Sequence, residues 1–139
     1  MSQENGAIGR RFFEEQDRLR GGPLDELCAP SYTIRIAGNP PMDLEGHKQF
    51  ATMFYSAFPD LLHIIEDTVA EGDKAVVRFT LHGTHKGDFM GIRPTGKEVS
   101  VSAVVIFQIA GGRVTQAFGV FDQAGMMQQL GAVPAQIAG

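Results

Sequence analysis

The chain has 139 residues, with 12 Lys and Arg against 16 Asp and Glu, and its net charge is −4. This length is most simply one domain, residues 1–139, and the scattered charges exclude the basic patch of a nucleic-acid-binding protein. The single cysteine, Cys28, excludes an intrachain disulfide and a multi-cysteine zinc site. No window approaches the roughly 18 apolar residues of a membrane span, and the polar N-terminus lacks the apolar segment of a signal peptide. We therefore expect a soluble, cytoplasmic protein that binds neither membranes nor nucleic acid.

The first third of the chain predicts a helix, a helical turn and a short strand. The helix spans Gln3–Arg20, and Gly21-Gly22-Pro23 ends it. The positions that share its narrow apolar face are Ile8, Phe12, Gln16 and Leu19. A turn at Leu24–Leu27 and a strand at Tyr32–Ile36 follow, and Gly38-Asn39-Pro40-Pro41 forms a loop.

A second helix is predicted over Leu44–Phe58, where Pro59-Asp60 ends it. Phe50, Phe54 and Phe58 recur every four residues, so their side chains lie along one face of this helix. We expect this aromatic stripe to pack in the core.

The remainder of the chain predicts four long antiparallel strands that pair as two hairpins. The strands are His63–Ala70, Ala75–His82, Lys97–Ile109 and Arg113–Phe121. Between the hairpins, the glycine-rich loop Gly83–Gly96 carries Phe89, Met90 and Ile92. Apolar side chains in an exposed loop are unfavourable, so we expect these residues to fold back over another part of the molecule.

Helices followed by an antiparallel meander predict an α+β fold, in which the helices cover one side of a curved sheet. The concave face of such a sheet would form a pocket lined by alternate strand residues. In the last strand, Gln116, Phe118, Val120 and Asp122 alternate onto one face, and this mixed set favours that face as the pocket wall. Asp122 has a second interpretation, as the N-cap of a final short helix, where it would accept a backbone N–H from Ala124 or Gly125.

Several motifs then occur in order along the chain. They are Ala57-Phe58-Pro59-Asp60, Glu71-Gly72-Asp73, the segment from Gly83 to Lys97, Val120-Phe121-Asp122-Gln123 and Gln129-Leu130-Gly131. Over about residues 45–133 this pattern resembles the SnoaL-like polyketide (ester) cyclase family of the nuclear-transport-factor-2-like superfamily. The resemblance implies a cone-shaped α+β barrel, with a curved antiparallel or mixed sheet wrapped around the N-terminal helices. It also implies homodimers that form through the sheet.

The resemblance also implies an activity and a site. Members close a ring of an aromatic polyketide by intramolecular aldol chemistry, without a metal or a cofactor. Asp122 would be the acid/base residue, acting on a small hydrophobic, carbonyl-rich ligand, and His85 would assist it or donate to a substrate carbonyl. The residues expected to bind the substrate are Phe118, Gln116, Phe89, Met90, Phe54 and Val120, with Phe89 and Met90 as a possible lid. For His85, the alternative is that it fixes its own loop by hydrogen-bonding to the backbone.

One departure from the family pattern leaves the function open. Gln116-Ala117-Phe118 stands where members commonly have Glu-x-Trp, so a carboxylate and an indole donor are both missing. One alternative function is a non-catalytic ligand-binding or accessory cone protein, in which Asp122 is only a cap. The other is a relative recruited to hydroxylation, isomerisation or epoxide opening.

The remaining polar residues give weaker indications. His47 is predicted to face solvent on the second helix, and the faces of His63 and His82 are not assigned by the pattern. No pair of histidines has metal-ligand spacing, and no strand, glycine loop and helix form a phosphate site. Finally, an outer sheet face carrying Val101 and Val105 would need cover, which predicts a two-fold dimer.

Overall fold

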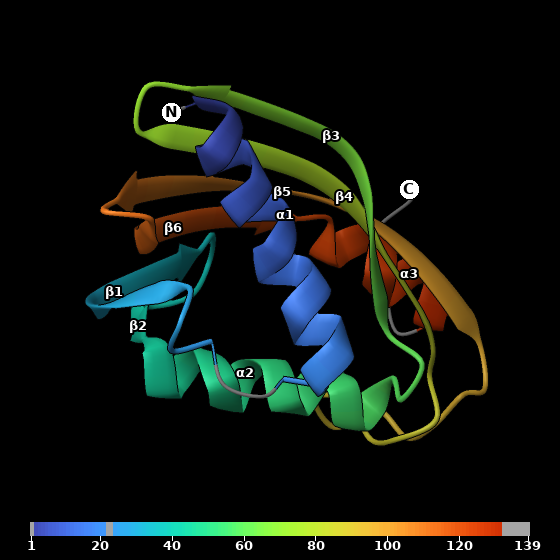
Figure 1. Ribbon diagram of the computed structural model, residues 1–139. Coiled ribbons are helices and arrows are strands. Elements are labelled where there is room, and N and C mark those ends of the chain that lie inside the picture. Colours follow the sequence, from blue (N-terminus) through green and yellow to red (C-terminus); the bar gives the residue numbers. More distant parts are fainter. Residues whose placement is uncertain (1, 22–23, 132–139) are drawn as a thin grey trace.

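The computed structural model describes residues 2–21 and 24–131, and Figure 1 shows the arrangement of its elements. In chain order these are α1 (Ser2–Leu19), β1 (Cys28–Ile36), β2 (Met42–Asp43), α2 (Leu44–Ala57), β3 (Leu62–Glu71), β4 (Lys74–Thr84), β5 (Glu98–Ala110), β6 (Arg113–Phe121) and α3 (Gln123–Leu130). Among the described helices, none is both long and apolar enough to cross a membrane.

The six strands form one mixed sheet in the order β2-β1-β6-β5-β4-β3. β1 runs parallel to β6, and the other neighbouring strands pair antiparallel. The sheet curves around α1, and α2 lies across its open side (Figure 1). The α+β prediction is confirmed, but the sheet stays open, with β2 and β3 at its edges, and does not close into a barrel.

Element boundaries follow the predictions closely where hydrophobic alternation is long. β6 has the predicted bounds, and both hairpins form. The turn of the second hairpin uses Gly111 and Gly112 at φ 59° and 79°, a left-handed backbone that glycine adopts without strain. β1 begins four residues before the predicted Tyr32, because the turn at Leu24–Leu27 leads directly into it: Cys28 N–H donates to the carbonyl of Leu24.

Hydrophobic periodicity in the sequence does not predict two short features of the structure. β2 has only two residues, which is too few for an alternating pattern to indicate a strand. At the end of α1, Gly21 adopts φ 83° and donates its N–H to the carbonyl of Gln16. Gly22 and Pro23, also predicted to end this helix, lie outside the described residues.

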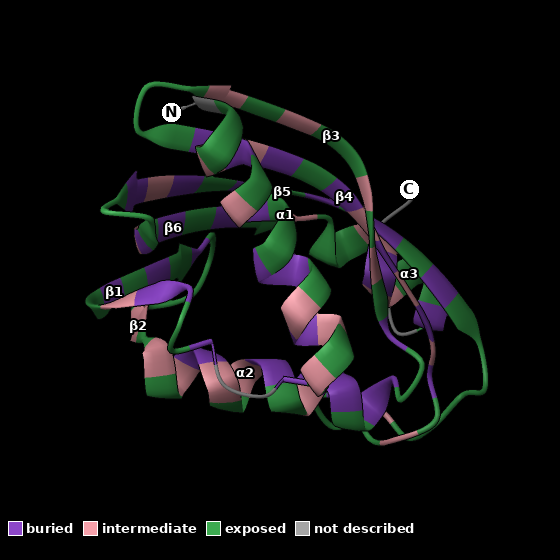
Figure 2. Ribbon diagram, in the orientation of Figure 1, coloured by how far each residue is buried: buried purple, intermediate pink, exposed green. Residues whose placement is uncertain are grey.

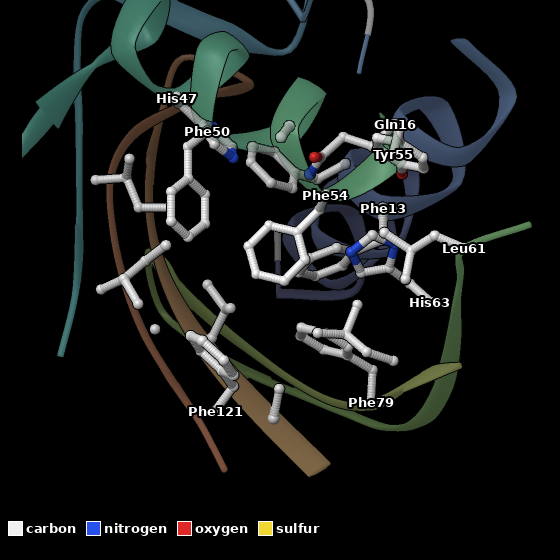
Figure 3. Close-up of a pocket in the computed structure, with 18 of the residues that line it drawn as sticks. Phe13, Gln16, His47, Phe50, Phe54, Tyr55, Leu61, His63, Phe79 and Phe121 are labelled. Atoms are coloured by element: carbon white, nitrogen blue, oxygen red, sulfur yellow. The ribbon is translucent and has the colours of Figure 1, made fainter. Parts of the chain in front are cut away.

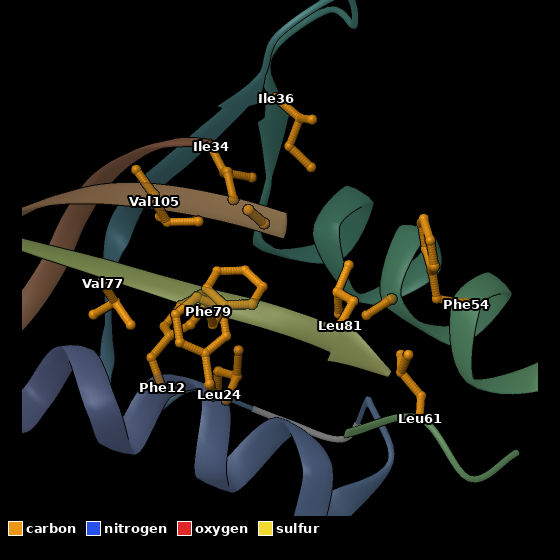
Figure 4. Packing of buried hydrophobic residues seen from close by; sticks show 14 of the residues in the cluster. Phe12, Leu24, Ile34, Ile36, Phe54, Leu61, Val77, Phe79, Leu81 and Val105 are labelled. Atoms are coloured by element: carbon orange, nitrogen blue, oxygen red, sulfur yellow. The ribbon is translucent and has the colours of Figure 1, made fainter. Parts of the chain in front are cut away.

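The core fills the space between the concave sheet face and the two long helices. Figure 2 shows buried and exposed residues alternating along β4 and β5, and Figure 4 shows side chains from both helices meeting those of the strands. Phe12 of α1 lies 4.8 Å from Phe107 of β5, between ring centroids. The aromatic stripe of α2 is confirmed as core, since Phe54 and Phe58 are buried and Phe50 packs partly buried against the same cluster.

The facing of β5 and β6 is the reverse of the prediction. Val101 and Val105 are buried on the inner face, whereas Val104, Ile106, Phe118 and Val120 are exposed on the outer face. In β6 a bulge shifts the register between Val114 and Gln116, and Ala117 and Gly119 then point inwards. The reason is space: a Cβ on Gly119 would lie 3.2 Å from Val105 Cγ2, so the crowded inner face takes the small residues of this strand.

Candidate functional site

A cavity lies between α1, α2 and the concave face of the sheet (Figure 3). Its volume is about 90 Å³. Most of its wall is aromatic or aliphatic. Its polar members are Gln16 from α1, His47 and Tyr55 from α2, and His63 from β3.

His63 is held by a carboxylate from the neighbouring helix. Its Nδ1 lies 2.7 Å from Oδ1 of Asp17, and its backbone N–H donates to Oδ2 of the same residue at 2.8 Å. The hydroxyl of Tyr55 also donates to Oδ1 of Asp17, at 2.6 Å. The ring of His63 packs between Phe13 and Phe79, with centroid distances of 4.9 and 5.2 Å. Three elements therefore fix both the position and the orientation of this imidazole.

The charge of Asp17 decides the tautomer of His63. Burial alone would raise the pKa of the Asp17 carboxyl, but the hydrogen bonds from His63 and Tyr55 outweigh burial and hold this pKa below its usual value. The ionised carboxylate can only accept hydrogen bonds, so His63 donates from Nδ1. In the neutral ring, Nε2 is then the basic nitrogen, as in other histidines that an aspartate orients.

His47 is the second histidine of the cavity wall, and the prediction that it faces solvent is wrong. It is only 6% exposed, because the inward face of α2 is wider than the aromatic stripe and also includes Ala51 and Tyr55. Its Nδ1 lies 3.0 Å from the hydroxyl of Tyr32, and its ring stacks on Phe12. Burial, with a smaller contribution from nearby His63, lowers the pKa of His47 to about 4. His47 is therefore neutral at physiological pH.

The prediction that Asp122 faces the cavity is wrong. Its side chain is exposed, lies outside the cavity wall and accepts the N–H of Gly125 at 2.9 Å as the N-cap of α3. Its backbone N–H donates to the carbonyl of Ser102. The geometry is that of the capping interpretation.

The other predicted site residues are divided between the cavity and the surface. Phe54 contributes to the cavity wall, and Val120 borders it although 48% of this residue is exposed. Phe118 and Gln116 lie on the exposed outer face of β6, where the guanidinium of Arg35 covers the Phe118 ring at 5.5 Å. Neighbouring Phe121, which the alternation had assigned to the opposite face, lines the cavity instead.

His85, Phe89 and Met90 also lie away from the cavity wall. His85 is fully buried, its Nδ1 accepts the N–H of Thr95 at 3.2 Å, and its own N–H donates to the carbonyl of Lys97, so it holds its loop in place. Phe89 is also fully buried, 5.1 Å from the ring of Phe54 behind the cavity. Met90 is 59% exposed and points away from the core, so neither residue forms a lid over the cavity in this structure.

The residues that carry the polar chemistry were mostly missed by sequence reasoning. Gln16 had a signal, because it is a polar residue in the middle of an otherwise apolar helix face. Asp17 and Tyr55 had none, since each lies in a polar or mixed stretch and they meet 38 residues apart in the sequence. His63 was noticed, but the face on which it lies depends on the packing of α1 against β3.

The chain resembles known proteins in both sequence and fold. The sequence profile of the SnoaL-like polyketide cyclase family matches residues 9–130. Comparison with proteins of curated function gives no match.

Solved structures with the same fold come from several bacteria. AclR from Streptomyces galilaeus, a candidate hydroxylase, superposes with a TM-score of 0.87 at 25% identity, covering 96% of this chain and 89% of its own. IdmH from Streptomyces antibioticus, a candidate polyketide cyclase, has a TM-score of 0.82 at 27% identity, with 91% and 98% covered. TsrD from Streptomyces laurentii has a TM-score of 0.82 at 29% identity, with 94% and 97% covered.

Proposed function

Because the chain belongs to the SnoaL-like polyketide cyclase family, we propose that it is an acid–base enzyme that removes a proton next to a carbonyl in a small, largely apolar molecule. His63 is the base in this proposal, and Asp17 is the residue that positions it. The reaction that follows is an intramolecular aldol-type ring closure.

The hydrogen-bonding geometry of His63 carries the proposal. Its Nδ1 is engaged by Asp17 at 2.7 Å, so Nε2 is the nitrogen left to accept a proton, in a cavity with apolar walls. An imidazole base of this kind suits a carbon acid whose anion is delocalised. By contrast, the carboxylate of Asp122 caps α3 at the surface.

The proposed reaction balances without a further reactant. Nε2 of His63 takes a proton from a carbon next to a carbonyl, and the electron pair of the broken C–H bond forms the enolate. The enolate carbon attacks a second carbonyl of the same molecule, which forms the new C–C bond and an alkoxide. The alkoxide then takes the proton back from His63. Asp17 stabilises the imidazolium in the interval, because its negative charge lies against Nδ1.

The test uses hydrogen exchange in place of the unknown substrate. 2-Tetralone has acidic protons next to its carbonyl, and proton NMR in D2O follows their replacement by deuterium. We expect the protein to accelerate this exchange, and His63→Gln to slow the accelerated rate by at least about 100-fold, as loss of a general base does. Asp17→Asn should slow it by at least about tenfold, because the amide no longer selects the tautomer. The imidazole nitrogen shifts of His63 should report this change of tautomer.

Asp122→Asn is the matched control, because it removes a carboxylate while keeping a good helix cap. It should leave both the exchange rate and the melting temperature unchanged. If Asp122→Asn abolishes exchange and His63→Gln does not, Asp122 is the base and the proposal for His63 is wrong. If the wild-type protein accelerates no exchange although it binds 2-tetralone, a non-catalytic binding function is favoured.

A further inference from the structure

Three polar side chains of the cavity wall have atoms without a hydrogen-bond partner. Within residues 2–21 and 24–131, nothing hydrogen-bonds to the side-chain amide of Gln16, to Nε2 of His47 or to Nε2 of His63. Gln16 is 4% exposed and His47 is 6% exposed, so both are almost fully buried. Polar groups in buried side chains normally have hydrogen-bond partners, so unpartnered ones call for an explanation.

These atoms are not sealed inside the protein. Among the described residues, the side-chain atoms that are both enclosed and unpartnered are Thr68 Oγ1 and His85 Nε2. The free atoms of Gln16, His47 and His63 therefore have accessible surface, and all three residues line the same cavity. Figure 3 shows them around the same space, with His47 beside Phe50 and with Gln16 and His63 across from it.

The hydrogen bond with Tyr32 determines the tautomer of His47, and therefore whether Nε2 is a donor or an acceptor in the cavity. Tyr32 is 1% exposed, and Nδ1 of His47 is the hydrogen-bond partner of its hydroxyl in the described structure. If Nδ1 carried the proton, the hydroxyl hydrogen of Tyr32 would be buried without an acceptor, which is unfavourable. Tyr32 therefore donates to Nδ1, and the neutral ring of His47 carries its proton on Nε2. His47 presents a hydrogen-bond donor to the cavity.

The wall also limits the charge of a ligand. The lining contains no Lys, Arg, Asp or Glu within the described residues. Asp17, an anion, lies directly behind His63, and the guanidinium of Arg20 lies outside the wall, 4.9 Å from the ring centroid of Tyr55. A carboxylate or phosphate brought into this cavity would lose its hydration, and no Lys or Arg of the described wall would compensate for that loss, which disfavours binding.

We propose that Nε2–H of His47 and the amide of Gln16 bind the oxygen of an uncharged carbonyl compound, and that the cavity excludes anionic ligands. This inference rests on the proposed function, since the bound carbonyl is the one whose neighbouring proton His63 removes. Hydrogen bonds to the oxygen would polarise the carbonyl and stabilise the enolate as it forms.

The experiment compares three bicyclic probes in NMR titrations. 2-Tetralone carries the carbonyl, tetralin has nearly the same shape without an oxygen, and 2-naphthoate is an anion of similar size. We expect the protein to bind 2-tetralone about tenfold more tightly than tetralin, as one to two net hydrogen bonds provide. 2-Naphthoate should bind at least about tenfold more weakly than 2-tetralone. The carbonyl carbon resonance of bound 2-tetralone should move downfield, which reports polarisation of the bond.

His47→Phe keeps the aromatic stacking on Phe12 but removes the donor, and Gln16→Leu removes the amide. Each variant should reduce the ratio of the association constants for 2-tetralone and tetralin to a value between about 1 and 3, with the affinity for tetralin unchanged. His47→Phe should also reduce the shift of the carbonyl carbon resonance. The matched control is His82→Phe, because His82 lies outside the cavity wall and contacts the hydroxyl of Ser100. If His47→Phe fails to fold, Gln16→Leu still tests the same ratio.

The binding results are independent of the proposed role of His63 as the base. His63→Gln should slow proton exchange by at least about 100-fold and leave the preference for 2-tetralone over tetralin intact, so an error in the identity of the base would not change the binding result. The inference is overturned if the wild-type protein binds tetralin as tightly as 2-tetralone, if both variants keep the preference, or if 2-naphthoate binds as well. Failure of all three probes to bind would also overturn it.

Discussion

At the scale of single residues, two histidines of one cavity are placed in opposite environments. His63 has a carboxylate at Nδ1, whereas His47 has a neutral phenol there and is almost fully buried. Environments that differ in this way separate the roles of two chemically identical groups. In our proposals His63 moves the proton and His47 donates a hydrogen bond.

The buried state of His47 predicts a dependence of stability on pH. Its pKa is about 4 in the folded protein against 6.5 for the free side chain. As pH falls below 6.5, the unfolded chain takes up a proton that the folded protein does not, so acid favours unfolding until about pH 4. Each pH unit in this window contributes about 1.4 kcal/mol, so His47 should lower the free energy of unfolding by about 3 kcal/mol in total.

Urea denaturation of the wild type and of His47→Phe across this pH range tests the prediction. The nearby ionisable groups, His63 and Asp17 behind it, are present in both proteins, and because His63 contributes to the lowered pKa of His47, the difference reports His47 together with its interaction with His63. Tyr32 stays protonated throughout, because burial raises its pKa well above the usual value. The two proteins should therefore diverge with falling pH, with the wild type losing more stability; parallel curves would show that His47 protonates freely in the folded protein.

At the scale of elements, α2 serves both the core and the cavity. One side of the helix packs Phe54 and Phe58 against Phe89 from the loop that follows β4, with ring centroids 5.1 and 5.5 Å apart. The same helix presents His47 and Tyr55 to the cavity. The aromatic cluster thereby fixes the position of the helix that carries part of the site.

Phe54→Ala should lower the free energy of unfolding by about 3–5 kcal/mol, because it removes a large buried ring and leaves a void. Chemical denaturation followed by circular dichroism gives the value. Met90→Ala is the control, since the Met90 side chain is 59% exposed and its removal should change stability by no more than about 0.5 kcal/mol. A change below about 1 kcal/mol for Phe54→Ala would mean that this face of α2 contributes little to the core.

At the scale of the whole molecule, an apolar row crosses the outer face of the sheet. One row of neighbouring residues crosses four strands there: Val69 pairs with Val76, Val76 with Ile106, and Ile106 with Phe118. Val69, Ile106 and Phe118 are 64%, 39% and 38% exposed. These exposed fractions show that the row is not covered within the described chain, and a contiguous exposed apolar face marks an interaction surface.

We predict that the protein is a homodimer joined through this row. A two-fold partner would present the same row, so the two apolar faces would cover each other. Sedimentation at micromolar concentration should give a dimer for the wild type and a monomer for Ile106→Glu, which places a charge in the middle of the face. Met90→Glu, a charge on an exposed loop, should remain dimeric. A monomeric wild type would contradict the prediction.

Local patterns in the sequence determined the elements and the class of fold. The four long strands, the two hairpins and the aromatic stripe of α2 could be predicted because alternation, turn residues and helical spacing depend on near neighbours along the chain. The motifs from Ala57 to Gly131 also indicated the family, which the profile match over residues 9–130 confirms.

The tertiary structure alone decided which face of each strand is inside and which polar groups meet. Alternation along β6 is compatible with either facing, and the bulge near Val114 together with the crowded neighbourhood of Gly119 selects the one observed. Asp17 and His63 are 46 residues apart and meet only because α1 lies inside the curve of the sheet beside β3. A carboxylate at the end of a strand, such as Asp122, has a local signal, whereas a pair assembled across two elements has none until the chain is folded.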